Sequence, residues 1–194
     1  MLSELLKNKK IILASKSPRR KELLAGLDIE FETRTKDIDE SYSEILSPHK
    51  VAEFLADKKA KAFKKELQVN EIVITSDTVV ICDGEILEKP KSKIQAFDML
   101  SKLSGKQHRV VTGVCLMSFD KTELFSDTTK VWFKKLSCDE MNYYIKKYEP
   151  FDKAGSYGIQ EWIGYIGVEK IEGTYFNVMG LPVDKLYQKL QLFV

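Results

Sequence analysis

The chain has 194 residues, of which 43% are hydrophobic and 31% are charged, a composition typical of globular proteins with a buried core. Its 31 basic and 29 acidic residues leave a formal net charge of +2, whereas general nucleic-acid binding needs a strong basic excess. We therefore expect one domain over residues 1–194 and no nucleic-acid partner. A small or local anionic ligand stays open.

The cysteines and the apolar runs bound the compartment. Cys82, Cys115 and Cys138 are odd in number and form no C-x-x-C pair, which argues against a zinc site or a disulfide framework. They are expected to be buried free thiols in a reducing cytosol. No apolar run approaches the roughly 20 residues of a membrane-spanning helix, and the N-terminus lacks a signal-peptide core. We expect a cytoplasmic protein with no membrane partner.

The first third of the chain predicts strands and helices in alternation. Lys10–Ala14 is a short apolar run typical of a buried strand. A helix is predicted over Pro18–Leu27, with Ser17 as its N-cap and proline at its first position. Ile29–Thr35 alternates apolar and polar residues and indicates a second strand. After an acidic, turn-like segment, a long helix is predicted over Pro48–Leu67.

The rest of the chain predicts a hairpin, two long strands and further helices. Strands are expected over Glu71–Ile81, Glu85–Pro90, Gln107–Phe119 and Glu123–Phe133, and helices over Ser92–Leu103, Ser137–Lys147 and Pro182–Leu192. Ser137 and Glu140 form a capping box. The segments AGSYGIQ and EGTYFNVMG are expected to be glycine-rich loops. The alternation predicts an α/β fold, a mixed sheet with flanking helices.

Two arginines stand at a helix start where acidic residues are usually favoured. Arg19 and Arg20 follow Ser17 and Pro18, although cations there face the positive end of the helix dipole. Backbone N–H groups at a helix N-terminus and guanidinium groups both bind phosphate, so the segment is consistent with a phosphate cradle. The alternative is that both arginines extend into water or pair with a nearby carboxylate.

Asp77 interrupts the apolar run Glu71–Ile81. A carboxylate in a buried strand is costly unless it is paired or binds a metal, and such carboxylates concentrate at functional sites. A second acidic group, Asp37, Asp39 and Glu40, offers further oxygen ligands for Mg²⁺ or Mn²⁺. The alternatives are a strand-end aspartate with its charge in water and a solvated acidic loop.

Lys89 directly precedes Pro90, which restricts the lysine backbone to extended conformations. It is either a phosphate ligand or one more surface lysine. His49 and His108 form no pattern of a catalytic triad or metal site and are expected to be structural. Arginines that bind phosphate, with carboxylates that hold a metal and activate water, together outline a hydrolase of phosphate anhydrides.

Five ordered motifs, spread over nearly the whole chain, also resemble the signatures of one family, the Maf nucleotide pyrophosphatases. The motifs are SKSPRRKELL (Ser15–Leu24), SDTVV (Ser76–Val80), LEKP (Leu87–Pro90), KAGSYGIQ (Lys153–Gln160) and GLPV (Gly180–Val183). S-x-S-P-R-R followed by S-D-T is a specific combination. Five matches in the same order along the chain are not explained by chance.

The resemblance implies hydrolysis of a nucleoside triphosphate between the α and β phosphates, which gives the monophosphate and pyrophosphate. It also implies a divalent metal cation, a cytoplasmic location and an α/β fold with two lobes around a central cleft, similar to the inosine triphosphate pyrophosphatases. Members are often dimers, so a homodimer is a possible assembly.

The resemblance also assigns roles to residues. It implies that Asp77 is the general base, and that Asp77 and Glu40 hold the metal. Substrate and phosphate binding is matched to Ser15, Arg19, Arg20, Lys59 and Lys89. Lys59 is matched through the pattern L-A-x-x-K-A, here LADKKA, in which Lys58 is a neighbouring alternative.

Substrate choice follows from the branch of the family that the chain resembles. Arg19, Thr78 and Gln160 match specificity positions, and the branch with Thr78 and Gln160 acts on dTTP and UTP. A glutamine amide offers a donor and an acceptor to the N3–H and carbonyl edge of uracil or thymine. One departure is that Glu161 and Trp162 follow Gln160 where a glycine is common.

Two alternatives to a dTTP/UTP pyrophosphatase stay open. One is a pyrophosphatase for modified nucleotides such as 7-methyl-GTP or pseudo-UTP. The other is a regulator of cell division that binds nucleotide without hydrolysing it. A regulator needs no general base, so Asp77 distinguishes the two classes. Under either enzymatic hypothesis, replacing Arg19 or Arg20 should weaken substrate use far more than folding, and removing them is expected to stabilise the free protein slightly.

Overall fold

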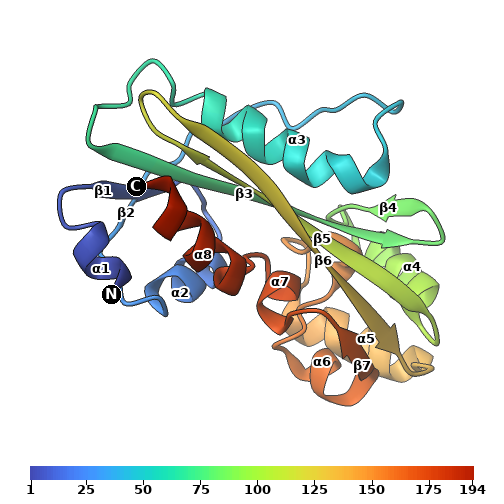
Figure 1. The fold of residues 1–194 in the computed structure, drawn as a ribbon. Helices are drawn as coiled ribbons and strands as arrows, with labels where there is room; N and C mark the ends of the chain where they lie inside the picture. Colours follow the sequence, from blue (N-terminus) through green and yellow to red (C-terminus); the bar gives the residue numbers. More distant parts are fainter. The chain divides into compact units, whose positions relative to one another are not determined.

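Isoleucine- and valine-rich segments form a seven-stranded sheet in the computed structural model, which describes residues 1–194 (Figure 1). The strand order is β2-β1-β3-β5-β6-β7, and β4 pairs with β3. The strands are β1 (Lys10–Leu13), β2 (Glu32–Thr33), β3 (Glu71–Cys82), β4 (Glu85–Leu87), β5 (Gln107–Met117), β6 (Thr122–Phe133) and β7 (Val168–Glu172).

The sheet is mixed, as the sequence predicts. Strand β1 runs parallel to both β2 and β3, with Lys10 opposite Glu71. Strands β3 and β4 form an antiparallel hairpin in which Val80 pairs with Leu87, and β6 is antiparallel to β7. Parallel strands need crossover connections, which helices supply here. The expected α/β fold with a mixed sheet and flanking helices is confirmed.

The helices begin at the caps that the sequence indicates. The Ser17 hydroxyl accepts the Arg20 N–H at 3.4 Å, and Ser137 and Glu140 exchange the two bonds of a capping box. The helices are α1 (Leu2–Leu5), α2 (Pro18–Ala25), α3 (Pro48–Lys61), α4 (Lys93–Leu103), α5 (Cys138–Tyr148), α6 (Trp162–Gly167), α7 (Tyr175–Met179), α8 (Val183–Phe193) and a 3₁₀ turn, η1 (Ala154–Ser156). None is both long enough and apolar enough to span a membrane.

The chain divides into two compact units. Unit 1 comprises Met1–Asp77, Thr112–Asp127 and Gly180–Val194, and unit 2 comprises Thr78–Val111 and Thr128–Met179. One core cluster of unit 1 packs α3 against strands through residues such as Ala56 and Val73. The core of unit 2 gathers α4, α5 and the strands around Leu100, Phe133 and Tyr144. One domain over residues 1–194 stays a prediction.

Four local expectations differ from the structure. The helix predicted over Pro48–Leu67 ends at Lys61, and the strand predicted over Glu85–Pro90 ends at Leu87. The strand predicted over Ile29–Thr35 is only Glu32–Thr33; the left-handed backbone of Asp28 (φ 52°) precedes it, and it pairs with β1 alone. The segment EGTYFNVMG is not a loop throughout, because β7 ends at Glu172 and Tyr175–Met179 is helical. Short elements like these depend on tertiary partners more than on local sequence.

The cysteine prediction is correct at two positions and wrong at one. Cys82 and Cys115 are buried free thiols, whereas Cys138 is exposed. Burial raises the pKa of the Cys115 thiol to about 12. Cys138 is the first residue of an amphipathic surface helix, α5, so its side chain faces away from the core.

Candidate active site

In unit 1, two acidic residues from distant parts of the chain meet on one lysine. Asp77 lies on β3 and is 8% exposed. Lys59 Nζ, from α3, lies 2.5 Å from Asp77 Oδ1 and 2.8 Å from Glu40 Oε1. The costly carboxylate that the sequence places in a buried strand is therefore paired.

The neighbouring lysine has a different partner. Lys58 Nζ lies 3.2 Å from Asp39 Oδ2 and donates to the Ser41 carbonyl oxygen at 3.0 Å. Consecutive residues of a helix point about 100° apart, so only Lys59 reaches Asp77. Of the two lysines in LADKKA, the structure places the second one at the acidic pair.

The donor set at Lys59 is compatible with a divalent cation. No three Asp, Glu, His or Cys side chains converge on a point that could hold a metal. Mg²⁺, however, needs only one or two carboxylates when phosphates and water complete its shell. Asp77 and Glu40 are two carboxylates that already meet at one cationic group, so they fit that requirement.

The other two acidic residues of the loop are engaged elsewhere. Asp37 Oδ1 lies 2.6 Å from Lys16 Nζ, and this ion pair lowers the pKa of Asp37. Bonds from Ser41 and then from Lys58 lower the pKa of Asp39 to about 2. Glu40 is thus the member of the acidic group that shares a cation with Asp77.

The SKSPRR segment is tied to GLPV within the same unit. Arg20 Nε donates to the Gly180 carbonyl oxygen at 2.8 Å, and the Ser15 hydroxyl accepts the Ser17 N–H at 3.2 Å. Burial lowers the pKa of the Arg20 guanidinium, while Asp77 and Glu40 act to raise it. Arg20 therefore lies within electrostatic reach of the acidic pair. Arg19 is its neighbour in the first turn of α2.

In unit 2, three of the motifs come together. Thr78 follows Asp77 on β3, and Val80 of the same strand contacts the loop that contains Gly155. The Gly155 N–H donates to the Glu88 carbonyl oxygen at 3.2 Å, which joins KAGSYGIQ to LEKP. The segments that carry Thr78, Lys89 and Gln160 are thus linked through main-chain and packing contacts.

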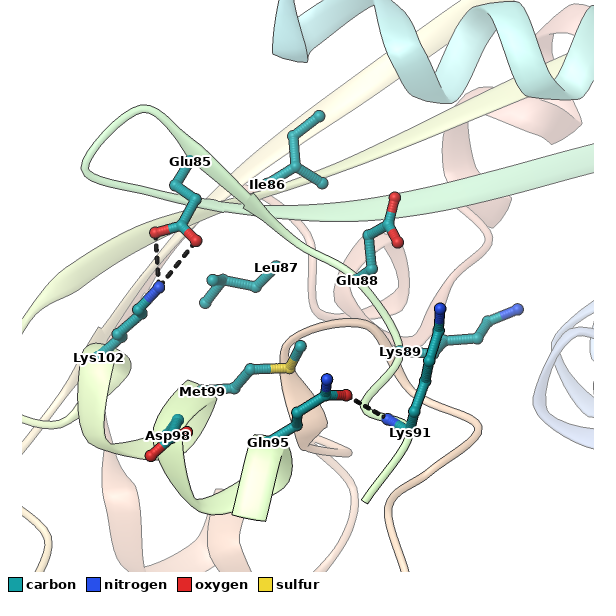
Figure 2. A pocket seen from close by; sticks show the side chains of 10 residues that line it. All are labelled: Glu85, Ile86, Leu87, Glu88, Lys89, Lys91, Gln95, Asp98, Met99 and Lys102. Atoms are coloured by element: carbon teal, nitrogen blue, oxygen red, sulfur yellow. Dashed lines mark hydrogen bonds and ion pairs between the residues drawn. The ribbon is translucent and has the colours of Figure 1, made fainter. Parts of the chain in front are cut away.

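Lys89 borders a pocket of about 420 Å³ between β4 and α4. Lys102 pairs there with Glu85 at 2.7 Å, and Figure 2 shows the exposed Lys89 side chain extending away from that pair. The remaining lining residues are Ile86, Leu87, Glu88, Lys91, Gln95, Asp98 and Met99. Lysines and carboxylates alternate around this pocket, so it has no clear preference for anions beyond Lys89 itself.

Gln160 carries an acceptor that no group of the protein uses. Its Oε1 atom is buried and has no hydrogen-bond partner. Buried polar atoms are nearly always paired, so an unused one in a loop is available to a ligand. This geometry is compatible with accepting an N–H from a nucleobase.

Sequence reasoning missed a second unpartnered group beside Asp77. The Ser76 hydroxyl is buried and has no hydrogen-bond partner. The signal that identifies Asp77, a polar residue in an apolar strand, also applied to Ser76. His108 is structural, as expected: it is buried, its Nε2 lies 2.7 Å from the Tyr157 hydroxyl, and burial lowers its pKa to about 4.

Comparisons with known proteins agree with the motifs. The chain is 52% identical over 191 residues to a protein of Parabacteroides distasonis named dTTP/UTP pyrophosphatase, covering 98% of this chain and 99% of the relative. A protein of the same name from Flavobacterium johnsoniae is 49% identical and covers 100% of both chains. The Ham1 protein of Staphylococcus aureus shares the fold, with a TM-score of 0.55 at 19% identity, over 96% of this chain and 100% of that protein. A family model described as Maf-like protein matches residues 10–193, and with relatives of about 50% identity over nearly the full length, the chain belongs to the Maf-like protein family.

Proposed function

We propose that this chain hydrolyses dTTP and UTP to the nucleoside monophosphate and pyrophosphate. The relatives that carry this activity in their names match the chain at about half of all positions, end to end. The observation that supports the reaction class is the pair of carboxylates, Asp77 and Glu40, on the Lys59 ammonium. Arg20 within electrostatic reach of that pair adds a group that binds phosphate.

In this proposal, unit 1 binds the triphosphate. The N-terminus of α2 offers backbone N–H groups that attract an anion, and Ser15, Arg19 and Arg20 stand at or beside it. Lys59 adds an ammonium within the same unit. Charge that develops on the phosphates during cleavage is then met by fixed cations, which is the main source of catalysis in phosphoryl transfer.

Asp77 is proposed as the general base. Its carboxylate accepts a proton from the attacking water, and the Lys59 ammonium at 2.5 Å fixes the orientation of that carboxylate. Asp77 and Glu40 are also the residues that would hold Mg²⁺ or Mn²⁺, which neutralises phosphate charge when bound. Glu40 lies on an exposed loop outside the sheet, so a shift of its carboxylate from Lys59 toward the ion would not disturb a strand.

Gln160 is proposed to recognise the nucleobase of the substrate. Its unpartnered Oε1 accepts the N3–H of uracil or thymine, and the amide N–H donates to a carbonyl of the same edge. Thr78, next to Asp77, and Arg19 complete the specificity set. Cytosine has an acceptor at N3 in place of the N3–H donor, so with Gln160 held in this orientation CTP would leave its Oε1 unpaired, which lowers the affinity for CTP relative to UTP.

A nucleotide panel tests the proposal. Purified protein with Mg²⁺ or Mn²⁺ is given UTP, dTTP, CTP, GTP, pseudo-UTP and 7-methyl-GTP, and pyrophosphate and orthophosphate are measured separately. We expect pyrophosphate from UTP and dTTP, and its loss after chelation of the metal. Faster turnover of 7-methyl-GTP or another purine would contradict the specificity. Nucleotide binding without release of pyrophosphate from any substrate would favour the non-hydrolysing regulator.

A further inference from the structure

A buried polar cluster in unit 2 includes Glu161, the residue that follows Gln160, and has no part in the proposed chemistry. The Tyr144 hydroxyl, on α5, donates a hydrogen bond to the Glu161 carboxylate, and Glu161 Oε1 lies 3.1 Å from Lys153 Nζ. The side chains of Glu161 and Lys153 are 19% and 9% exposed, and Tyr144 is fully buried. Interactions so removed from water are stronger than surface pairs and costly to break.

The cluster closes a ring around the two residues Ile159 and Gln160. The Tyr144 hydroxyl oxygen accepts the Gly158 N–H at 3.0 Å while it donates to Glu161. On the main chain, the Glu161 N–H donates to the Gly158 carbonyl oxygen at 3.0 Å. The residues before and after Ile159-Gln160 are therefore joined twice, once through side chains and once through backbone.

Close packing reinforces this ring. A Cβ atom added to Gly158 would lie 2.9 Å from the Glu161 carboxyl carbon, and one added to Gly164 would lie 1.8 Å from the Ile159 carbonyl oxygen. Real Cβ atoms do not approach so closely, so a side chain at position 164 would clash with the Ile159 backbone, and one at position 158 would have to displace the Glu161 carboxylate. The backbone of Ile159 is thus fixed between the ring and helix α6.

We propose that Glu161, Tyr144 and Lys153 are positioning residues that orient Gln160 and thereby set the discrimination between nucleobases. The inference rests on the proposed function, because Gln160 is the residue assigned there to the base. The buried Oε1 of Gln160 has no protein partner to orient it. The point from which the side chain extends is set by its backbone, which the ring of hydrogen bonds holds. A preorganised acceptor discriminates between bases better than a mobile one.

The test compares Tyr144→Phe with Tyr143→Phe. Tyr144→Phe keeps the aromatic side chain and removes the hydroxyl that joins Gly158 to Glu161. Tyr143, its neighbour on α5, is 44% exposed, accepts a bond from Lys147 and also packs on Trp162 of α6. The matched control therefore loses a hydroxyl on the same helix without touching the ring.

The readout is the ratio of kcat/KM for UTP to kcat/KM for CTP. We expect Tyr144→Phe to lower this ratio about tenfold, through a higher KM for UTP, and Tyr143→Phe to change it less than about twofold. Glu161→Gln keeps an acceptor for Tyr144 but loses the ion pair with Lys153, so its ratio should fall by about threefold. If Tyr144→Phe does not fold, the ratio measured for Glu161→Gln tests the inference.

Amide hydrogen exchange of the full chain gives a second readout. Exchange at Gly158 should rise in Tyr144→Phe and not in Tyr143→Phe, because its N–H loses its acceptor. An active variant with an unchanged UTP/CTP ratio would overturn the inference, even if its melting temperature fell. Wild-type protein without turnover would instead overturn the proposed hydrolysis. The ratio of dissociation constants for UTP and CTP would then decide the positioning role.

Discussion

In unit 1, the candidate residues form ion pairs with one another. In unit 2, the backbone around the candidate residue Gln160 is fixed by hydrogen bonds from residues that have no part in the proposed chemistry. In unit 1, Lys59 forms ion pairs with both Asp77 and Glu40, and Arg20 interacts electrostatically with the same two carboxylates. In unit 2, a ring that includes Tyr144 fixes the backbone beside Gln160.

This difference teaches how each region should respond to substitution. Removing one charge in unit 1 changes the charge balance of the partly buried ion pairs around Lys59, so chemistry and local electrostatics change together. In unit 2, the hydrogen bonds that support the loop can be weakened while Gln160, which is proposed to contact the nucleobase, keeps its chemical identity. Substitutions in unit 1 should therefore lower turnover, and those behind Gln160 should alter selectivity.

The largest effect is expected from Asp77→Asn. The amide keeps the size of the side chain but cannot take a proton from water, so kcat for UTP should fall about 10³-fold. Pyrophosphate release measures turnover, and calorimetry with a non-hydrolysable UTP analogue should show binding largely retained. Asp83→Asn is the control, because Asp83 is exposed and pairs with Lys106 in the β3–β4 hairpin. Unchanged turnover in Asp77→Asn would remove Asp77 from the mechanism.

The next effect separates two roles of Arg20. Arg20→Ala should raise KM for UTP about 30-fold through loss of a charge-assisted contact with phosphate. It should also lower the free energy of unfolding by about 1 kcal/mol, because the bond to the Gly180 carbonyl is lost. Urea unfolding measures the second quantity, and exposed Arg109→Ala is the control. A more stable Arg20→Ala protein would contradict this role of the Gly180 bond.

For Arg20, the bond to Gly180 opposes the expectation that removing the two arginines stabilises the free protein slightly; for Arg19 that expectation stays a prediction. The dipole argument on α2 considers only the helix itself, and it omits the contact between Arg20 and Gly180, which lie 160 residues apart. Local sequence does correctly predict the Ser17 cap and the helix start at Pro18, since both depend on neighbours along the chain.

The distinction between local signals and contacts of distant residues also explains which parts of the candidate site are predictable from the sequence. Asp77 is identifiable from sequence because a carboxylate in an apolar strand is conspicuous. The choice between Lys58 and Lys59 needs the direction of each side chain on α3. The pairing of Tyr144 with Glu161 has no local signal, because it depends on how a helix and a distant loop pack.

A smaller effect concerns pH and the core of unit 2. Burial lowers the pKa of His108 to about 4, whereas the unfolded chain has a histidine pKa near 6.5. The unfolded state thus binds the proton first, and stability falls as pH decreases from about 6.5 to 4. Between pH 7 and pH 5, the wild type should lose about 2 kcal/mol more than His108→Gln, measured by urea unfolding. His49→Gln, at an exposed position, should behave like the wild type; equal losses in all three proteins would show that His108 does not titrate as proposed.

The smallest effect compares one helix cap in each unit. Ser17→Ala and Ser137→Ala should each lower the free energy of unfolding by about 1 kcal/mol, because each hydroxyl accepts an N–H of its own first turn. Only Ser17 stands at the helix start assigned to phosphate, so only Ser17→Ala should also raise KM for UTP, by about threefold. Thermal unfolding and steady-state kinetics on the two variants measure both quantities. An equal KM in both would mean that the N-terminus of α2 binds no substrate phosphate, and the arginines beside it would then need another explanation.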